Sequence, residues 1–121
     1  MSPLYPIYLK LAGKRVLIVG GGKLALQKVA SLEPTGAHIA IVAPCILPDL
    51  QARATAGQFT LMQRPYRDAD LPGATLVYAA TNDSTLNHHI VAEARRLGIT
   101  VNAVDDPEFS DFYTPSIVRR G

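Results

Sequence analysis

The stretch RVLIVGGGKLALQK, residues 15–28, decides the fold prediction. Residues 15–19 are hydrophobic and rich in β-branched side chains, which is typical of a buried parallel strand. Three glycines follow, and apolar residues then recur at the spacing of a helix over residues 24–32. The stretch therefore predicts a strand that turns tightly into a helix, which Pro34 and Gly36 end.

The same alternation of strand and helix patterns continues to the end of the chain. Further strands are predicted at residues 38–43, 58–63, 75–80 and 99–104, with an edge strand at 116–120. Further helices are predicted at residues 47–56 and from a cap at Asn82 or Asp83 to Leu97. Short loops between alternating elements predict an α/β fold, a Rossmann-like doubly wound parallel sheet in a single domain of residues 1–121.

Composition and charge exclude several classes of protein. The 121 residues are 48% apolar and 18% charged, as in a globular domain. The net charge of +2 is too small to predict nucleic-acid binding, and no apolar run reaches the roughly 18 residues of a membrane span. The single cysteine, Cys45, cannot form an internal disulfide, so we expect a cytoplasmic protein.

The glycine turn matches the pattern G-x-G-x-x-A, which is typical of dinucleotide binding. Gly20 permits the tight turn, Gly22 lets the backbone approach a pyrophosphate, and Ala25 lets the helix pack close to the sheet. The helix N-terminus then offers free N–H groups to the phosphates. The alternative is a glycine-rich turn with no ligand, but the position between a strand and a helix favours a nicotinamide cofactor.

The acidic residue that usually binds the ribose is missing. It should end the second strand, but residues 41–45 hold no carboxylate, and the nearest is Asp49. No arginine stands there for a 2′-phosphate either, so backbone groups of Ala43, Pro44 and Cys45 are expected to contact the adenosine end. Cys45 either lines that edge or is a buried structural thiol.

Polar residues follow the fourth and fifth predicted strands, at the edge where α/β proteins bind ligands. Thr81 contacts the cofactor or substrate, or else belongs to a helix cap. Asp105 and Asp106 offer a carboxylate that can accept a proton, or else form a solvated Asp-Pro turn. His88 and His89 are interpreted as a helix surface, and we predict no metal site because no acidic partner lies at ligand spacing.

Several segments together resemble a known family. VGGGK, AATND, VNAVDDP and PSIVRRG occur here in the order found in the precorrin-2 dehydrogenase family, which includes the N-terminal module of siroheme synthase. The resemblance covers residues 6–121, and it is the combination of these motifs that is specific. Two positions depart from the family pattern, because Leu24 stands where Val is common and Cys45 stands where Glu is frequent.

The resemblance implies an activity and a set of site residues. The family oxidises precorrin-2, a reduced tetrapyrrole that carries many carboxylates, to sirohydrochlorin with NAD, and some members also insert ferrous iron. The implied proton acceptor is Asp105. The expected substrate contacts are Asn102, Asp106, Arg119 and Arg120. The basic residues Lys23, Arg64, Arg67, Arg119 and Arg120 either attract the anionic substrate or are ordinary surface charges. The implied cofactor contacts are Gly20, Gly22, Lys23, Leu24, Pro44 and Cys45, to which the residue analysis adds Ala43 and Thr81.

Family members continue into a helical region that forms a homodimer. We therefore expect this chain to be part of a longer, homodimeric protein. One alternative is a regulatory module that senses a nucleotide without catalysis. Another is a truncated domain that keeps the fold alone.

Overall fold

A computed structural model describes residues 3–104 and 106–114 of the chain. Within these residues the strands are β1 (Arg15–Val19), β2 (His38–Val42), β3 (Thr60–Met62), β4 (Leu76–Ala79) and β5 (Thr100–Ala103). The helices are α1 (Lys23–Leu32), α2 (Pro48–Thr55) and α3 (Ser84–Arg96), with short 3₁₀ turns at Glu33–Thr35, Asp68–Asp70 and Pro107–Phe109. The predicted α/β fold is confirmed.

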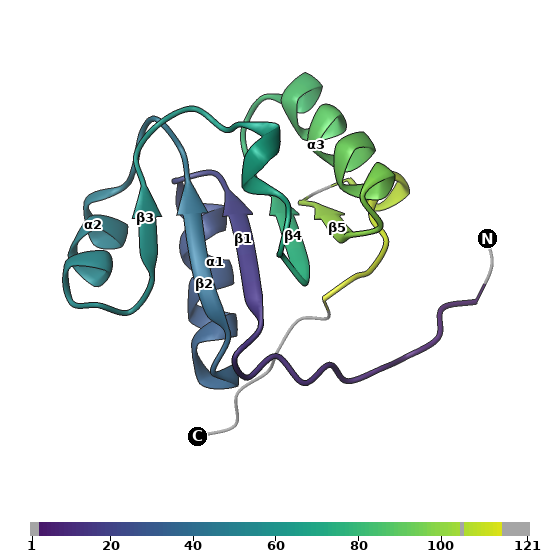
Figure 1. Ribbon diagram of the computed structural model, residues 1–121, viewed down its shortest axis with the longest axis horizontal. Coiled ribbons are helices and arrows are strands. Elements are labelled where there is room, and N and C mark those ends of the chain that lie inside the picture. The colour runs from purple at the N-terminus through teal and green to yellow at the C-terminus, as the bar shows by residue number, and fades with distance from the viewer. Residues whose placement is uncertain (1–2, 105, 115–121) are drawn as a thin grey trace.

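All strand pairs in the sheet are parallel, in the order β3-β2-β1-β4-β5. The central strand β1 lies between β2 and β4, so that Val16 pairs with Ile39 on one side and Leu76 on the other. The chain first winds outward from β1 to β3 and then returns to β4 on the other side (Figure 1). This reversal next to β1 is the point where doubly wound sheets bind ligands, at the carboxyl ends of the strands.

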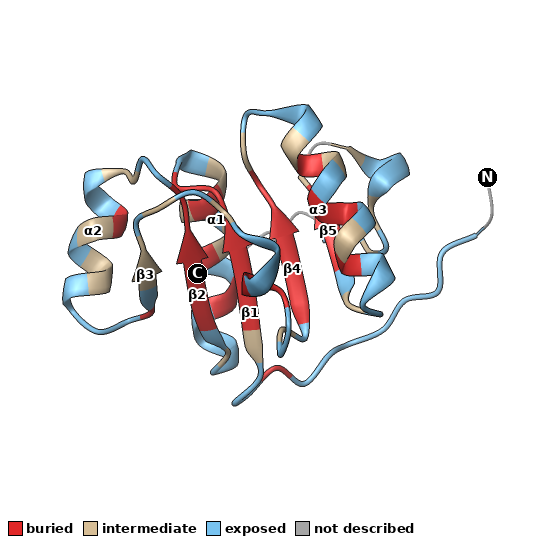
Figure 2. Ribbon diagram, turned by 45° about the horizontal axis from the view of Figure 1, so that its top comes forward, coloured by how far each residue is buried: buried red, intermediate tan, exposed pale blue. Residues whose placement is uncertain are grey.

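Helices cover both faces of the sheet (Figure 1). Successive residues of a strand point to opposite faces, so Ile18 packs in one core cluster and Leu17 in the other. The first cluster includes Val29 of α1, and the second includes Ile90 of α3. Burial on both faces explains why the central strands are continuously hydrophobic, and they are the buried centre of the molecule in Figure 2.

The predicted elements lie within a few residues of the observed ones. Gly36 adopts a left-handed φ of 75° and ends the turn after α1, as predicted. The third strand is shorter than predicted, because only Thr60–Met62 pair with β2 at the edge of the sheet. The predicted edge strand at 116–120 lies outside the described residues.

The N-terminal segment extends away from the domain (Figure 1). It carries several exposed large apolar side chains, namely Leu4, Tyr5, Ile7, Tyr8 and Leu9. In the described part of the chain, no helix has both the length and the apolar character needed to cross a membrane.

Candidate functional site

Gly20 begins the tight turn between β1 and α1. Its φ of 136° lies in the region that favours glycine, and a Cβ there would lie 2.4 Å from the carbonyl oxygen of Ala80. Its N–H donates to the carbonyl of Val42 at 3.0 Å. Gly20 is therefore held between the ends of two neighbouring strands, and no larger residue fits without moving the backbone.

Gly21 is also required by close packing, which the sequence pattern did not indicate. A Cβ at Gly21 would lie 2.3 Å from the carbonyl oxygen of Cys45, and the Gly21 carbonyl accepts a hydrogen bond from the N–H of Leu47 at 2.9 Å. The middle position of G-x-G accepts any residue in the general pattern. Only the run of three glycines hinted that the loop after β2 approaches the turn here.

Gly22 has a different role, because a Cβ there would meet nothing within 4 Å. It is the N-cap residue of α1, and no side chain caps this helix end. The first N–H groups of α1 have no partner within the helix, so they are available to an anion. Ala25 is fully buried against the sheet, as predicted. The open helix end fits the pyrophosphate of a dinucleotide.

A cavity of about 680 Å³ opens beside this turn, and we call it the glycine-turn cavity. Its volume lies within the usual range for small-molecule and cofactor sites. The structure brings together in its lining all of the predicted cofactor residues, which are Gly20, Gly22, Lys23, Leu24, Ala43, Pro44, Cys45 and Thr81. That they contact the cofactor stays a prediction.

The side of this cavity that is predicted to contact adenosine is formed by the loop between β2 and α2. Cys45 is exposed there, so the alternative of a buried structural thiol is wrong. Among the described residues that line the cavity, the one carboxylate is that of Asp83, at the opposite end. Asp83 caps α3 by accepting a hydrogen bond from the N–H of Leu86 at 3.2 Å. The expected cap was Asn82 or Asp83, and the structure selects Asp83.

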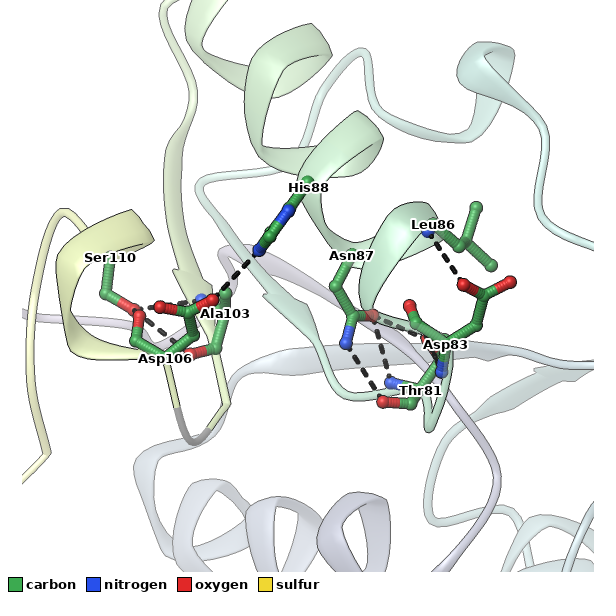
Figure 3. Close-up of polar contacts among 8 residues, drawn as sticks. All are labelled: Thr81, Asp83, Leu86, Asn87, His88, Ala103, Asp106 and Ser110. Atoms are coloured by element: carbon green, nitrogen blue, oxygen red, sulfur yellow. Dashed lines mark hydrogen bonds and ion pairs between the residues drawn. The ribbon is translucent and has the colours of Figure 1, made fainter.

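The loop after β4 is anchored to α3 through Asn87 (Figure 3). The Thr81 hydroxyl donates to the side-chain oxygen of Asn87 at 2.6 Å, and the Asn87 amide donates to the Thr81 carbonyl at 2.9 Å. The N–H of Asp83 donates to the Thr81 hydroxyl at 3.1 Å. The Thr81 side chain thus stabilises the loop that precedes α3, as in the capping alternative. The residue also lines the cavity.

The segment after β5 is anchored to the same helix. Nε2 of His88 lies 2.9 Å from a carboxylate oxygen of Asp106 (Figure 3). The His88 ring also stacks on Phe109, with 4.0 Å between the ring centroids. His89 likewise contacts Asp68 at 2.9 Å. Both histidines lie on the partly exposed side of α3, as interpreted, and the fold brings each an acidic partner from a distant part of the chain, which no ligand spacing indicated.

The structure describes Asn102, one of the predicted substrate contacts, but not three other predicted site residues. Asn102 is buried at the end of β5, and its amide donates to the carbonyl of Phe112 at 2.7 Å. Asp105, Arg119 and Arg120 lie outside the described residues, so their roles stay predictions. In the described parts of the chain, no three His, Cys, Asp or Glu residues gather as a metal site would require.

Arg64, a candidate for attracting an anionic substrate, is engaged elsewhere. It contacts both carboxylate oxygens of the buried Asp70, at 2.6 and 2.9 Å. The hydrogen bonds from Arg64, followed by one from the N–H of Arg67, hold the pKa of Asp70 below its ordinary value. This pair stabilises the loop before β4 and does not face the cavity.

Comparison with known proteins shows the family. The sequence profile of a family described as "Putative NAD(P)-binding" matches residues 7–116. The chain belongs to this NAD(P)-binding family. The predicted NAD cofactor agrees with the family's description, and the match covers both the glycine turn and β5.

Curated relatives and a solved structure extend this result. The chain is 41% identical over 115 residues to siroheme synthase of Nitrosococcus oceani, covering 95% of the chain and 25% of that protein. It is 45% identical over 115 residues to siroheme synthase of Ectopseudomonas mendocina, covering 95% of the chain and 24% of that protein. The fold is similar to SirC, a precorrin-2 dehydrogenase, with a TM-score of 0.79 and 26% identity over 98% of the chain and 58% of SirC.

The resemblance to the precorrin-2 dehydrogenase family is thereby confirmed. The chain spans about a quarter of the length of the siroheme synthases that it matches.

Proposed function

We propose that the protein containing this chain catalyses the NAD-dependent dehydrogenation of precorrin-2 to sirohydrochlorin. The observation that carries the proposal is the likeness to SirC, which is named a precorrin-2 dehydrogenase and whose fold matches 98% of the chain. The siroheme synthase relatives support the same substrate class. The chain's contribution is the cofactor site and the carboxyl edge of the sheet.

The residues of the glycine turn would hold the cofactor. The N-terminus of α1 supplies unpaired N–H groups to the pyrophosphate, and Gly22 leaves room for it. Ala43, Pro44 and Cys45 would border the adenosine, and Thr81 the nicotinamide side. When bound, NAD supplies the acceptor for the hydride that leaves the substrate.

Loss of a hydride from the macrocycle also requires loss of a proton, and we assign its acceptance to Asp105. Its neighbours in the chain support this assignment, because Val104 and Asp106 follow the carboxyl end of β5. The adjacent strand β4 ends in residues that line the glycine-turn cavity. Asn102, Asp106, Arg119 and Arg120 remain the proposed substrate contacts, and the whole protein is proposed to be a cytoplasmic homodimer.

A regulatory nucleotide-sensing module is not favoured. Such a module commonly binds the ribose through an acid at the end of the second strand, and no carboxylate stands there. The named relatives are enzymes of tetrapyrrole chemistry, not sensors.

The proposal is tested by mixing the protein, NAD and precorrin-2 without oxygen and following NADH absorbance. We expect NADH from the wild-type protein and none from Asp105→Asn. The neighbouring Asp106→Asn serves as the matched variant and should keep turnover while raising KM. Absence of NADH from the wild-type protein would contradict the proposed function, and full activity of Asp105→Asn would contradict the assigned proton acceptor.

Insertion of metal is a separate question with a separate assay. Sirohydrochlorin is incubated with ferrous iron or cobalt, and the change in its visible absorbance is followed. An enzyme that also inserts metal accelerates this change over the protein-free rate, whereas a dehydrogenase alone leaves it unchanged.

A further inference from the structure

A second cavity, of about 260 Å³, lies at the carboxyl end of β5. We call it the β5 cavity, and its polar lining residues are Lys28, Asn102, Asp106, Ser110, Tyr113 and Thr114. It lies at the same edge of the sheet as the glycine-turn cavity, since β5 pairs with β4 and α1 contributes to both linings. Lys23 lies at the first cavity and Lys28 at the second, about 7.5 Å apart along the axis of α1.

The side chain of Lys28 is held at the wall of this cavity. Its ammonium lies 5.2 Å from the centroid of the Tyr78 ring and donates to the Thr114 hydroxyl at 3.3 Å. Tyr78 is buried, and its ring is fixed edge-on against Phe112 at 5.5 Å. Burial raises the pKa of Tyr78 to about 12, so the ring stays neutral and attracts the cation.

Most other hydrogen-bond donors of the cavity are engaged within the protein. The Ser110 hydroxyl bonds to the carbonyls of Ala103 and Asp106, and the Tyr113 hydroxyl donates to the carbonyl of Pro107. The Asn102 amide donates to the carbonyl of Phe112. The Ser110 and Tyr113 hydroxyls shape the cavity and have no proton left to donate, whereas Asn102 keeps a second amide N–H.

Lys28 and Thr114 are different. An ammonium has three N–H donors, and Lys28 uses one of them on Thr114. The Thr114 hydroxyl accepts that bond and keeps its own proton as a donor. Among the residues that the structure describes, no carboxylate forms an ion pair with Lys28. Within the described residues, the cavity therefore holds unused donors together with a positive charge that has no carboxylate partner.

Among the described residues that line this cavity, the one carboxylate is that of Asp106. It contacts His88 of α3 (Figure 3), and α3 and α1 pack in the core clusters on opposite faces of the sheet. The positive end of the cavity is therefore on the α1 side. An anionic group is attracted there and would receive charge-assisted hydrogen bonds.

We propose that Lys28 and Thr114 form a subsite that binds one carboxylate of the tetrapyrrole substrate. The inference rests on the proposed function, which supplies a substrate rich in carboxylates. A carboxylate held here anchors the macrocycle beside β5, next to the cavity that is proposed to hold NAD. Lys28 is then a determinant of tetrapyrrole affinity and has no part in cofactor affinity.

The test measures the binding of sirohydrochlorin, by its visible absorbance, and of NAD, by calorimetry. The variants are Lys28→Gln, Lys28→Arg and the control Lys14→Gln, which removes an exposed lysine that precedes β1 at the opposite end of the sheet. We expect Lys28→Gln to weaken sirohydrochlorin binding about tenfold or more, the range for loss of a charge-assisted hydrogen bond. Lys28→Arg should keep affinity within about threefold. Lys14→Gln and all NAD affinities should be unchanged.

The outcomes separate this subsite from the proposed function. If the wild-type protein binds sirohydrochlorin and Lys28→Gln binds it equally well, the subsite is wrong while the dehydrogenase proposal stands. If Lys28→Gln loses as much affinity for NAD as for sirohydrochlorin, the proposal that Lys28 acts on the substrate alone is also wrong. If the wild-type protein neither binds sirohydrochlorin nor forms NADH, the proposed function fails and the subsite with it.

Discussion

Asn87 and Thr81 are joined by three hydrogen bonds, which run in both directions. The Thr81 hydroxyl donates to the Asn87 side chain at 2.6 Å, and the Asn87 amide donates back to the Thr81 carbonyl at 2.9 Å. The next residue, His88, contacts Asp106 at 2.9 Å. The first turns of α3 therefore anchor the loops that follow both β4 and β5, at the edge where we place cofactor and substrate.

Replacing Asn87 with alanine should loosen the loop after β4. Asn87 is buried, so the change also leaves the N–H and carbonyl of Thr81 without these partners. We expect the free energy of unfolding to fall by about 1–3 kcal/mol, together with weaker NAD binding. Urea denaturation measures the first effect and calorimetric titration with NAD the second.

A double-mutant cycle between Asn87→Ala and Thr81→Val shows whether the two side chains act together. Because they share a hydrogen bond, the double variant should be less destabilised than the sum of the single variants, by about 0.5–1.5 kcal/mol. Simple additivity of the two changes would contradict the anchoring role of the pair.

Gly22→Ala should separate cofactor binding from folding. A Cβ at Gly22 meets nothing within 4 Å, and its φ of −99° suits alanine. The melting temperature should therefore stay close to that of the wild type. The methyl group would occupy space beside the N-terminus of α1, so NAD affinity should fall about tenfold or more. Unchanged NAD affinity would mean that the pyrophosphate does not lie here.

Gly21→Ala is the matched contrast and should show the opposite result. Its Cβ would lie 2.3 Å from the Cys45 carbonyl oxygen, so the backbone must move. We expect a loss of about 1–3 kcal/mol in the free energy of unfolding, as is usual for overpacking, measured by urea denaturation. A variant as stable as the wild type would show that the loop after β2 does not approach the turn this closely.

His88→Gln and His89→Gln form a matched pair on neighbouring residues. Both histidines contact an aspartate at 2.9 Å, but only Asp106, the partner of His88, lines the β5 cavity. Steady-state kinetics with precorrin-2 should show kcat/KM reduced several-fold for His88→Gln and unchanged for His89→Gln. If both changes reduced kcat/KM equally, His88 would have a role in stability alone.

The pair of Arg64 and Asp70 should make the stability depend on pH. The hydrogen bonds from Arg64 lower the pKa of Asp70 in the folded protein below its ordinary 3.8. A lowered folded pKa stabilises the protein at pH values above the unfolded pKa, and that stability is lost as the pH falls through the folded pKa. Asp70→Asn should therefore cost about 2–3 kcal/mol at neutral pH, and this cost should shrink as the pH falls from the ordinary pKa through the lowered one.

Denaturation of wild type and Asp70→Asn across this pH range measures the difference. Asp68→Asn is the comparison, because its carboxyl pKa is also lowered, by His89 first, but its side chain is half exposed. Its effect should be small. A pH-independent difference between wild type and Asp70→Asn would contradict the ion pair.

Local patterns predicted the architecture well. The strand, the turn and the start of α1 were predicted from residues 15–28, because the conformation of each depends on residues that are close together in the sequence. The alternation of buried strands with helices then left few topologies, and the doubly wound sheet was confirmed. The roles of Gly20 and Ala25 followed from the same local pattern.

Contacts between distant segments could not be predicted from the sequence. Position 21 requires glycine because the carbonyl of Cys45 approaches it. The partner of His88 is Asp106, which lies in the segment that follows β5. The side-chain bonds of Thr81 and the position of Lys28 over Tyr78 likewise depend on how the elements pack. These are tertiary relationships, and no spacing in the chain indicates them.

The central claim is that NAD bound at the glycine turn receives a hydride from precorrin-2. It is tested most directly by measuring NADH and sirohydrochlorin together, as the protein turns over precorrin-2 with NAD in the absence of oxygen. The account predicts that the two products form in equal amounts and that Gly22→Ala slows both at limiting NAD. Sirohydrochlorin formed without NADH, or neither product above the protein-free rate, would contradict it.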